Sequence, residues 1–69
     1  MNYAEVAKAM AYYWSEVKKT KSDYWMGRLF GMEETLELLG IEYETEYDND
    51  LFVTAVIVNG NRVEVEEIA

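Results

Sequence analysis

The chain has 69 residues, contains neither cysteine nor histidine, and carries a formal net charge of −8 at pH 7. Without these two residue types it can form no disulfide, no zinc site of the cysteine and histidine kind, no thiol nucleophile and no imidazole base. We expect one small domain over residues 1–69, in which two tryptophans, six tyrosines and two phenylalanines supply much of the buried area.

The sequence indicates a cytoplasmic protein. No run approaches the roughly 18 apolar residues that a membrane helix needs, and the N-terminus lacks the basic-then-apolar order of a signal peptide. The lack of cysteine also fits a reducing compartment.

A first helix is expected over about residues 3–19. Apolar side chains from Tyr3 to Val17 recur every three or four positions, which places them on one helix face. Asn2 and Glu5 have the spacing of a capping box, in which the first side chain caps the new helix.

A second helix is expected over about residues 22–39. The polar run KKTKSD interrupts the first pattern, Thr20 or Ser22 can cap the new helix, and Gly40 suits its C-terminal end. Its apolar stripe consists of Trp25, Leu29, Met32, Leu36 and Leu39. Because the intervening turn is short, the two helices are expected to form an antiparallel hairpin.

Two glycines, Gly27 and Gly31, interrupt the second helix, where each costs about 1 kcal/mol relative to alanine. In an antiparallel hairpin they would face the regions of Trp14 and Met10, so we interpret them as sockets for bulky side chains. The alternative is that they form a flat strip for another helix, as GxxxG motifs do in membranes.

The second half of the chain has the two-residue period of strands, which are expected at about residues 41–47, 51–58 and 61–67. Asn59 and Gly60 lie between the last two runs and tolerate positive φ, which predicts a type I′ hairpin turn. The predicted fold class is therefore α+β, an antiparallel helical hairpin packed on one face of a three-stranded antiparallel sheet.

The register of the predicted hairpin divides the sheet residues between two faces, because a shift of one residue exchanges the faces. Val56 would pair with Val63, and Ile57 with Arg62. The face toward the helices would carry Phe52, Thr54, Val56, Val58, Val63 and Val65, with Tyr43 and Tyr47 if the first hairpin turns at Asn49 and Asp50. The outer face would carry an apolar ribbon, Leu51, Val53, Ala55 and Ile57, between acidic rows that contain Glu42, Glu44, Glu46, Glu64 and Glu66.

This apolar ribbon predicts a partner, because a strand with solvent on one side normally alternates apolar and polar residues. We expect the ribbon and the acidic rows to bind a partner protein, and we expect self-association as a homodimer through the same face. The alternative is that long glutamate stems shield the ribbon and that nothing binds there.

Charge is distributed unevenly along the chain. Residues 1–22 hold four lysines and two glutamates, a balance of +2, so the remaining 47 residues carry −10. Such a surface repels nucleic acid and attracts basic partners. We therefore expect a basic protein surface as the partner, with no direct binding of nucleic acid.

Rows of carboxylates beside apolar contacts can also imitate a phosphate backbone and occupy the nucleic-acid groove of another protein. In this general appearance the chain is similar to small acidic phage inhibitors, anti-CRISPR proteins among them, although no motif assigns it to a particular family. The alternative is that the acidity only keeps a small domain soluble.

The sequence predicts no enzyme activity, cofactor or metal site. Ser15 and Ser22 have no histidine partner, and no glycine-rich phosphate loop is present. Residues 48–50 are similar to the start of a calcium loop, but that motif requires glycine where Val53 stands and glutamate where Asn59 stands. We interpret residues 48–50 as a turn.

Three functions follow from these patterns. The preferred one is a non-enzymatic interaction domain that self-associates and binds a basic partner protein, which it would thereby inhibit. The second is a nucleic-acid mimic that acts on a nuclease or another DNA-binding enzyme. The third is a structural or assembly subunit that docks through its helical hairpin.

Overall fold

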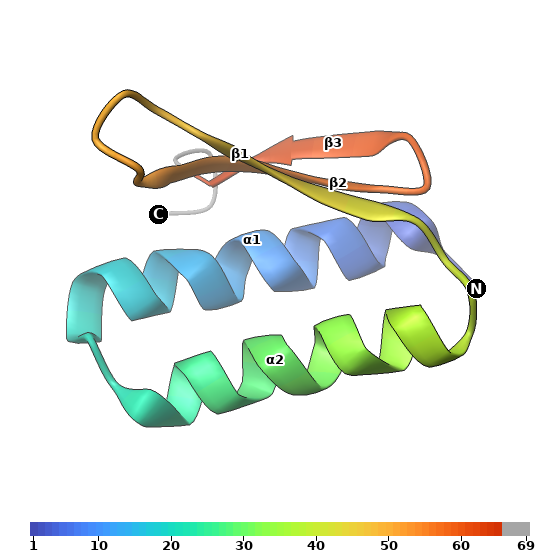
Figure 1. Ribbon diagram of the computed structural model, residues 1–69, viewed down its shortest axis with the longest axis horizontal. Helices are drawn as coiled ribbons and strands as arrows, with labels where there is room; N and C mark the ends of the chain where they lie inside the picture. Colours follow the sequence, from blue (N-terminus) through green and yellow to red (C-terminus); the bar gives the residue numbers. More distant parts are fainter. Residues whose placement is uncertain (66–69) are drawn as a thin grey trace.

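Two helices followed by a three-stranded antiparallel sheet make up the protein, as predicted. The computed structural model describes residues 1–65. The elements are α1 (Tyr3–Thr20), α2 (Asp23–Leu38), β1 (Tyr43–Tyr47), β2 (Val53–Val58) and β3 (Asn61–Glu64). The sheet has the order β1-β2-β3, α1 packs on β2 and β3, and α2 packs on α1 (Figure 1).

The predicted helix ends are confirmed. Asn2 Oδ1 accepts the backbone N–H of Glu5 at 3.1 Å, and Ser22 Oγ accepts the backbone N–H of Tyr24 at 3.1 Å. Each side chain thereby satisfies a donor that the first turn of a helix leaves without a partner. Gly40 follows α2 with a φ of 71°, the left-handed conformation that ends many helices. In the part of the chain that the structure describes, neither helix has the length and apolarity to cross a membrane.

The hairpin of β2 and β3 has the predicted register. Val56 pairs with Val63, and Ile57 pairs with Arg62. Asn59 and Gly60 have φ values of 49° and 86°, which a type I′ turn requires at both of its central positions.

The connection between β1 and β2 is organised by Asp48. Its carboxylate accepts the backbone N–H groups of Asp50 at 2.8 Å and Phe52 at 3.0 Å. Its carbonyl accepts the N–H of Leu51 at 3.1 Å, so residues 48–51 form the predicted turn around Asn49 and Asp50.

A bulge at Thr54 changes the register at the start of β2. Glu46 pairs with Ala55 and the next residue, Tyr47, pairs with Val53, so Thr54 has no partner on β1. Val53 therefore lies on the same face as Tyr47, and it lines a groove together with Trp14 of α1. The prediction that Val53 lies on the outer face is wrong, because the extra residue reverses the alternation.

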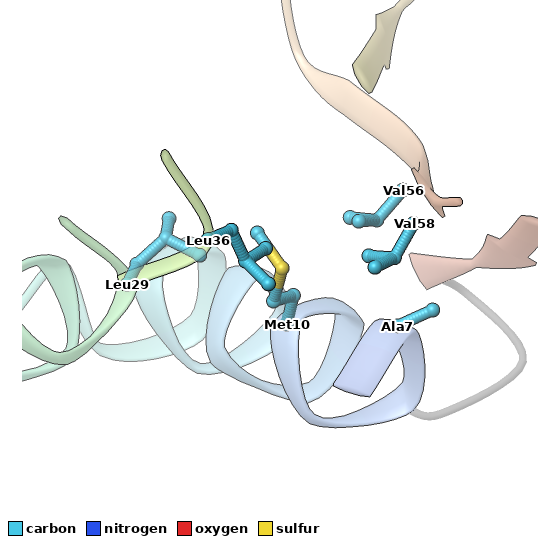
Figure 2. Packing of buried hydrophobic residues seen from close by; sticks show 6 residues of the cluster. All are labelled: Ala7, Met10, Leu29, Leu36, Val56 and Val58. Carbon is cyan, nitrogen blue, oxygen red and sulfur yellow. The ribbon is translucent and has the colours of Figure 1, made fainter. Parts of the chain in front are cut away.

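The core lies between α1, α2 and the inner face of β2. Its fully buried residues are Ala7, Met10, Leu29, Leu36, Val56 and Val58 (Figure 2). Val65 is also buried, and Tyr43 and Val63 pack against this cluster, as predicted. Tyr47 and Phe52 instead keep 56% and 58% of their surface exposed at the edge of the sheet.

Aromatic side chains join the two helices near their connection. The rings of Tyr12 and Trp25 meet edge to face, with centroids 5.5 Å apart. The guanidinium of Arg28 donates to the hydroxyls of Tyr13 at 3.1 Å and Tyr24 at 3.2 Å. These contacts fix the antiparallel alignment of α1 and α2.

Gly27 and Gly31 face away from α1, so their interpretation as sockets is wrong. Both residues are exposed, and a Cβ atom added at either position would have no neighbour within 4 Å. The buried side chains of α2, Leu29 and Leu36, lie on the opposite side of the helix. Gly27 is two residues from Leu29, which is about 200° around a helix of 3.6 residues per turn.

Candidate functional site

The predicted acidic residues of the first strand lie along the edge of the sheet. Glu44 pairs with Ile57 and Glu46 pairs with Ala55, while Glu42 precedes β1. The carbonyl of Glu42 accepts the N–H of Asn59 at 2.8 Å, which extends the contact with β2. All three glutamates are therefore held by the backbone pairing of β1 and β2.

The predicted apolar ribbon is not continuous. Val53 lies on the helix side, Ala55 has no exposed surface, and Ile57 is half-buried. Leu51 is 79% exposed, but it lies in the loop with a φ of 66° rather than in β2. The expectation of a homodimer was based on this ribbon and stays a prediction. Glu66, which was assigned to one of the acidic rows, lies outside the described residues.

Arg62 pairs with two of the predicted acidic residues. Its guanidinium donates across the central strand β2 to Glu46 Oε1 of β1 at 2.9 Å, and to Glu64 Oε1 of its own strand β3 at 3.0 Å. The hydrogen bond from Arg62 holds the pKa of Glu46 below its ordinary value of 4.5. Because Ala55 pairs with both Glu46 and Glu64, this bridge spans its position, and part of the acidic charge there is compensated.

An acidic hollow lies where the end of α2 meets the start of β1. It is open and has a volume of about 780 Å³. Its carboxylates come from Glu37, Glu42 and Glu44, and its apolar lining comes from Ile41, Tyr43 and Ile57. The hollow therefore combines negative charge with apolar contact area.

Tyr43 connects the sheet to α2 at this site. Its hydroxyl donates to Glu37 Oε1 at 2.9 Å. This hydrogen bond, together with desolvation and the charges of Glu33 and Glu37, raises the pKa of Tyr43 to about 12. Partial burial, followed by repulsion from Glu37, raises the pKa of Glu33. The end of α2 thus gathers negative charge in a partly shielded position.

Glu37 was not predicted as a site residue, although the sequence holds a signal for it. The last turn of α2 contains no basic residue. Carboxylates are disfavoured at the C-terminal end of a helix, because the helix dipole is negative there. An acidic last turn therefore marks a position where stability alone does not explain the residue type.

A second hollow, the basic groove, is lined by Lys18 and Lys21 and lies at the end of the molecule opposite the acidic hollow. In Figure 1 the loop between β1 and β2 is at the same end as the connection of the two helices, and the β2–β3 turn is near the end of α2. The groove has a volume of about 360 Å³. Its lining includes Trp14, Val17, Lys18 and Lys21 from α1 and its C-cap, Phe52 from the connection between β1 and β2, and Val53 from β2.

The outer side of α2 is a third exposed surface. Tyr24, Phe30 and Leu38 expose 59%, 55% and 81% of their surface, and Gly27 and Gly31 are exposed beside them. The alternative interpretation of the glycines, a flat strip for another helix, agrees with this position. None of the contacts within residues 1–65 shows what would cover the strip.

Within residues 1–65 no group of three or more acidic side chains is placed to hold a metal ion. Comparisons of the chain with models of known protein families, with curated proteins and with solved structures found no match.

Proposed function

We propose that the protein is a non-enzymatic interaction domain of the cytoplasm that binds a basic segment of a partner protein in the acidic hollow. The observation that carries this proposal is the arrangement of Glu37, Glu42 and Glu44 around Ile41, Tyr43 and Ile57. Arginine and lysine side chains match such a site, because they join an apolar stem to a cationic head.

The distribution of charge supports this choice of partner. The chain carries −8 in total and −10 outside residues 1–22, so a basic partner is attracted and nucleic acid is repelled. Arg62 compensates Glu46 and Glu64, whereas no ion pair within residues 1–65 compensates Glu37, Glu42 or Glu44. The three carboxylates of the hollow therefore keep their full negative charge.

The proposal is tested with two peptides of equal charge, one that alternates arginine with leucine and one that alternates arginine with serine. We expect the arginine–leucine peptide to bind more tightly, because leucine side chains can contact the apolar lining of the hollow. Equal affinity would show that the interaction depends on charge alone and would contradict a defined site.

Two variants locate the binding. Glu44→Lys reverses one charge at the hollow, and Asp50→Lys makes the same change in the loop at the other end of the molecule. We expect Glu44→Lys to weaken binding of the arginine–leucine peptide and Asp50→Lys to leave it nearly unchanged. An equal loss in both variants would contradict the assignment to the hollow.

Competition separates this function from nucleic-acid mimicry. If the protein imitates a phosphate backbone, as the anti-CRISPR-like alternative requires, DNA displaces it from a captured partner. If it recognises a basic segment that does not bind nucleic acid, DNA has no effect at constant salt concentration.

A further inference from the structure

The basic groove differs in charge from the rest of the molecule. Of the six basic residues in the chain, Lys8, Lys19 and Arg62 form ion pairs with carboxylates. Lys18 and Lys21, which line the groove, form no ion pair with any of residues 1–65. Two cations that form no ion pair with residues 1–65 of an acidic protein favour an anionic occupant.

The lining of the groove is otherwise mostly apolar. Trp14 and Val17 come from α1, and Val53 faces them because of the bulge at Thr54. Phe52, which is 58% exposed, lies at the edge of the same groove. An occupant must therefore bring an apolar body as well as an anionic group.

Trp14 carries an unused hydrogen-bond donor. Its Nε1 atom is buried and has no acceptor within the described part of the chain. Buried donors without an acceptor are rare in native proteins, and each one requires an explanation. The described part of the chain thus leaves one hydrogen-bond donor unsatisfied in a side chain that lines the groove.

We propose that this groove binds a small hydrophobic anion, namely a carboxylate joined to a medium-length alkyl chain or an aromatic ring. The apolar body would lie against Trp14, Val17 and Val53, and the carboxylate would lie between Lys18 and Lys21. A volume of about 360 Å³ is in the range of small-molecule sites.

The test uses decanoate as the probe, below the concentration at which it forms micelles. The chain has two tryptophans, and only Trp14 lines the groove, so the indole N–H NMR signal of Trp25 is an internal control. We expect decanoate to shift the Trp14 signal saturably and to leave the Trp25 signal in place. Absence of a saturable shift at Trp14 would overturn the proposal.

A comparison of decanoate with decanol tests the role of the anion. Decanol has the same chain without the charge, and we expect it to bind about tenfold more weakly at equal ionic strength, since two exposed ion pairs are lost. Equal affinity for decanol and decanoate would overturn the proposed selectivity.

The matched variants are Lys18→Glu with Lys21→Glu, and Lys19→Glu as the control. Lys19 is on the same turn of α1 but does not line the groove and pairs with Glu16. We expect the double variant to lose about tenfold or more in affinity for decanoate and the Lys19→Glu variant to keep it. Equal behaviour of both variants would contradict the assignment. A Trp14 signal that shifts with protein concentration alone would assign the groove to a second copy of the chain and would also overturn it.

Discussion

Tyr43 and Glu37 form a hydrogen bond of 2.9 Å that joins the edge strand of the sheet to the last turn of α2. The two residues are six positions apart in the sequence, on either side of the bend at Gly40. Their contact fixes the position of one carboxylate at the acidic hollow. It also couples the shape of the hollow to the protonation of the Tyr43 phenol.

The first prediction concerns the titration of this phenol. The pKa of Tyr43 is about 12 in the folded protein and 10.0 without the surrounding structure. Because the folded value is the higher one, the stabilisation from this hydrogen bond is complete below pH 10 and is lost as the pH rises toward 12.

Absorbance of tyrosinate in the wild type and in Tyr43→Phe isolates this titration by difference. We expect a midpoint near pH 12 and a shift toward 10 in Glu37→Gln, in which the acceptor charge is removed. Glu34→Gln, a neutralisation on α2 that does not touch Tyr43, is the control. A midpoint that stays the same in Glu37→Gln would show that the hydrogen bond is not the cause.

The second prediction concerns the glycines of α2. Gly27→Ala and Gly31→Ala should each raise the free energy of unfolding by about 1 kcal/mol, which corresponds to about 4–8 °C in Tm for a domain of this size. The added methyl group would meet no atom within 4 Å. Gly40→Ala should instead lower the stability, because Gly40 has a φ of 71°.

Thermal unfolding followed by circular dichroism checks this prediction. If Gly27→Ala or Gly31→Ala destabilised the protein at a concentration where it is monomeric, the glycines would face another part of the chain, and the orientation of α2 described above would be incorrect.

The third prediction compares a buried and an exposed side chain. Met10 is fully buried in the core, so Met10→Ala should lower the free energy of unfolding by about 2–5 kcal/mol. Leu38 is 81% exposed, so Leu38→Ala should change it by less than about 0.5 kcal/mol. Urea denaturation measures both values. A large loss in Leu38→Ala would indicate that the outer side of α2 is covered by another molecule.

The fourth prediction concerns the pairing of Arg62 with Glu46. In Arg62→Gln the pKa of Glu46 should rise toward 4.5, because the hydrogen bond that lowers it is removed. The folded pKa of Glu46 is below this value, so the stabilisation is present above it and is lost as the pH falls through the folded pKa. Carboxyl NMR signals report the pKa of Glu46 directly, and Lys8→Gln, which breaks a different ion pair, should leave it unchanged.

The fold could be predicted from local signals wherever those signals were strong. Asn2 and Ser22 mark helix starts because their side chains accept backbone N–H groups of the first turn. Gly40 marks the end of α2 because it adopts a positive φ. Asn59 and Gly60 set the register of β2 and β3 because a two-residue type I′ turn permits only one pairing.

Of the two errors in the fold, the position of Val53 depended on a distant part of the chain, whereas the orientation of the glycines did not. The loop of residues 48–52 allows several registers between β1 and β2. No residue type in the loop predicts the bulge at Thr54, which places Val53 on the side of α1. The outward position of Gly27 and Gly31 could have been inferred from the stripe of Leu29 and Leu36, which lies on the opposite side of α2.

The candidate site was predictable only in part. Glu42, Glu44 and Ile57 were named as partner-binding residues, and the structure places them around one hollow. Glu37 and Ile41 also line this hollow, but they precede the sheet. A prediction that assigns strand residues to the two faces of the sheet therefore does not include them. Their approach depends on the bend at Gly40.

Binding of a basic segment in the acidic hollow can be measured residue by residue in an amide NMR titration with the arginine–leucine peptide. We expect saturable shift changes at Glu44, Ile57 and Gly60, which line the hollow, and none at Asp50. The changes should weaken as salt is added, because the attraction is electrostatic. Changes centred elsewhere, or changes of equal size in Glu44→Lys, would contradict the claim.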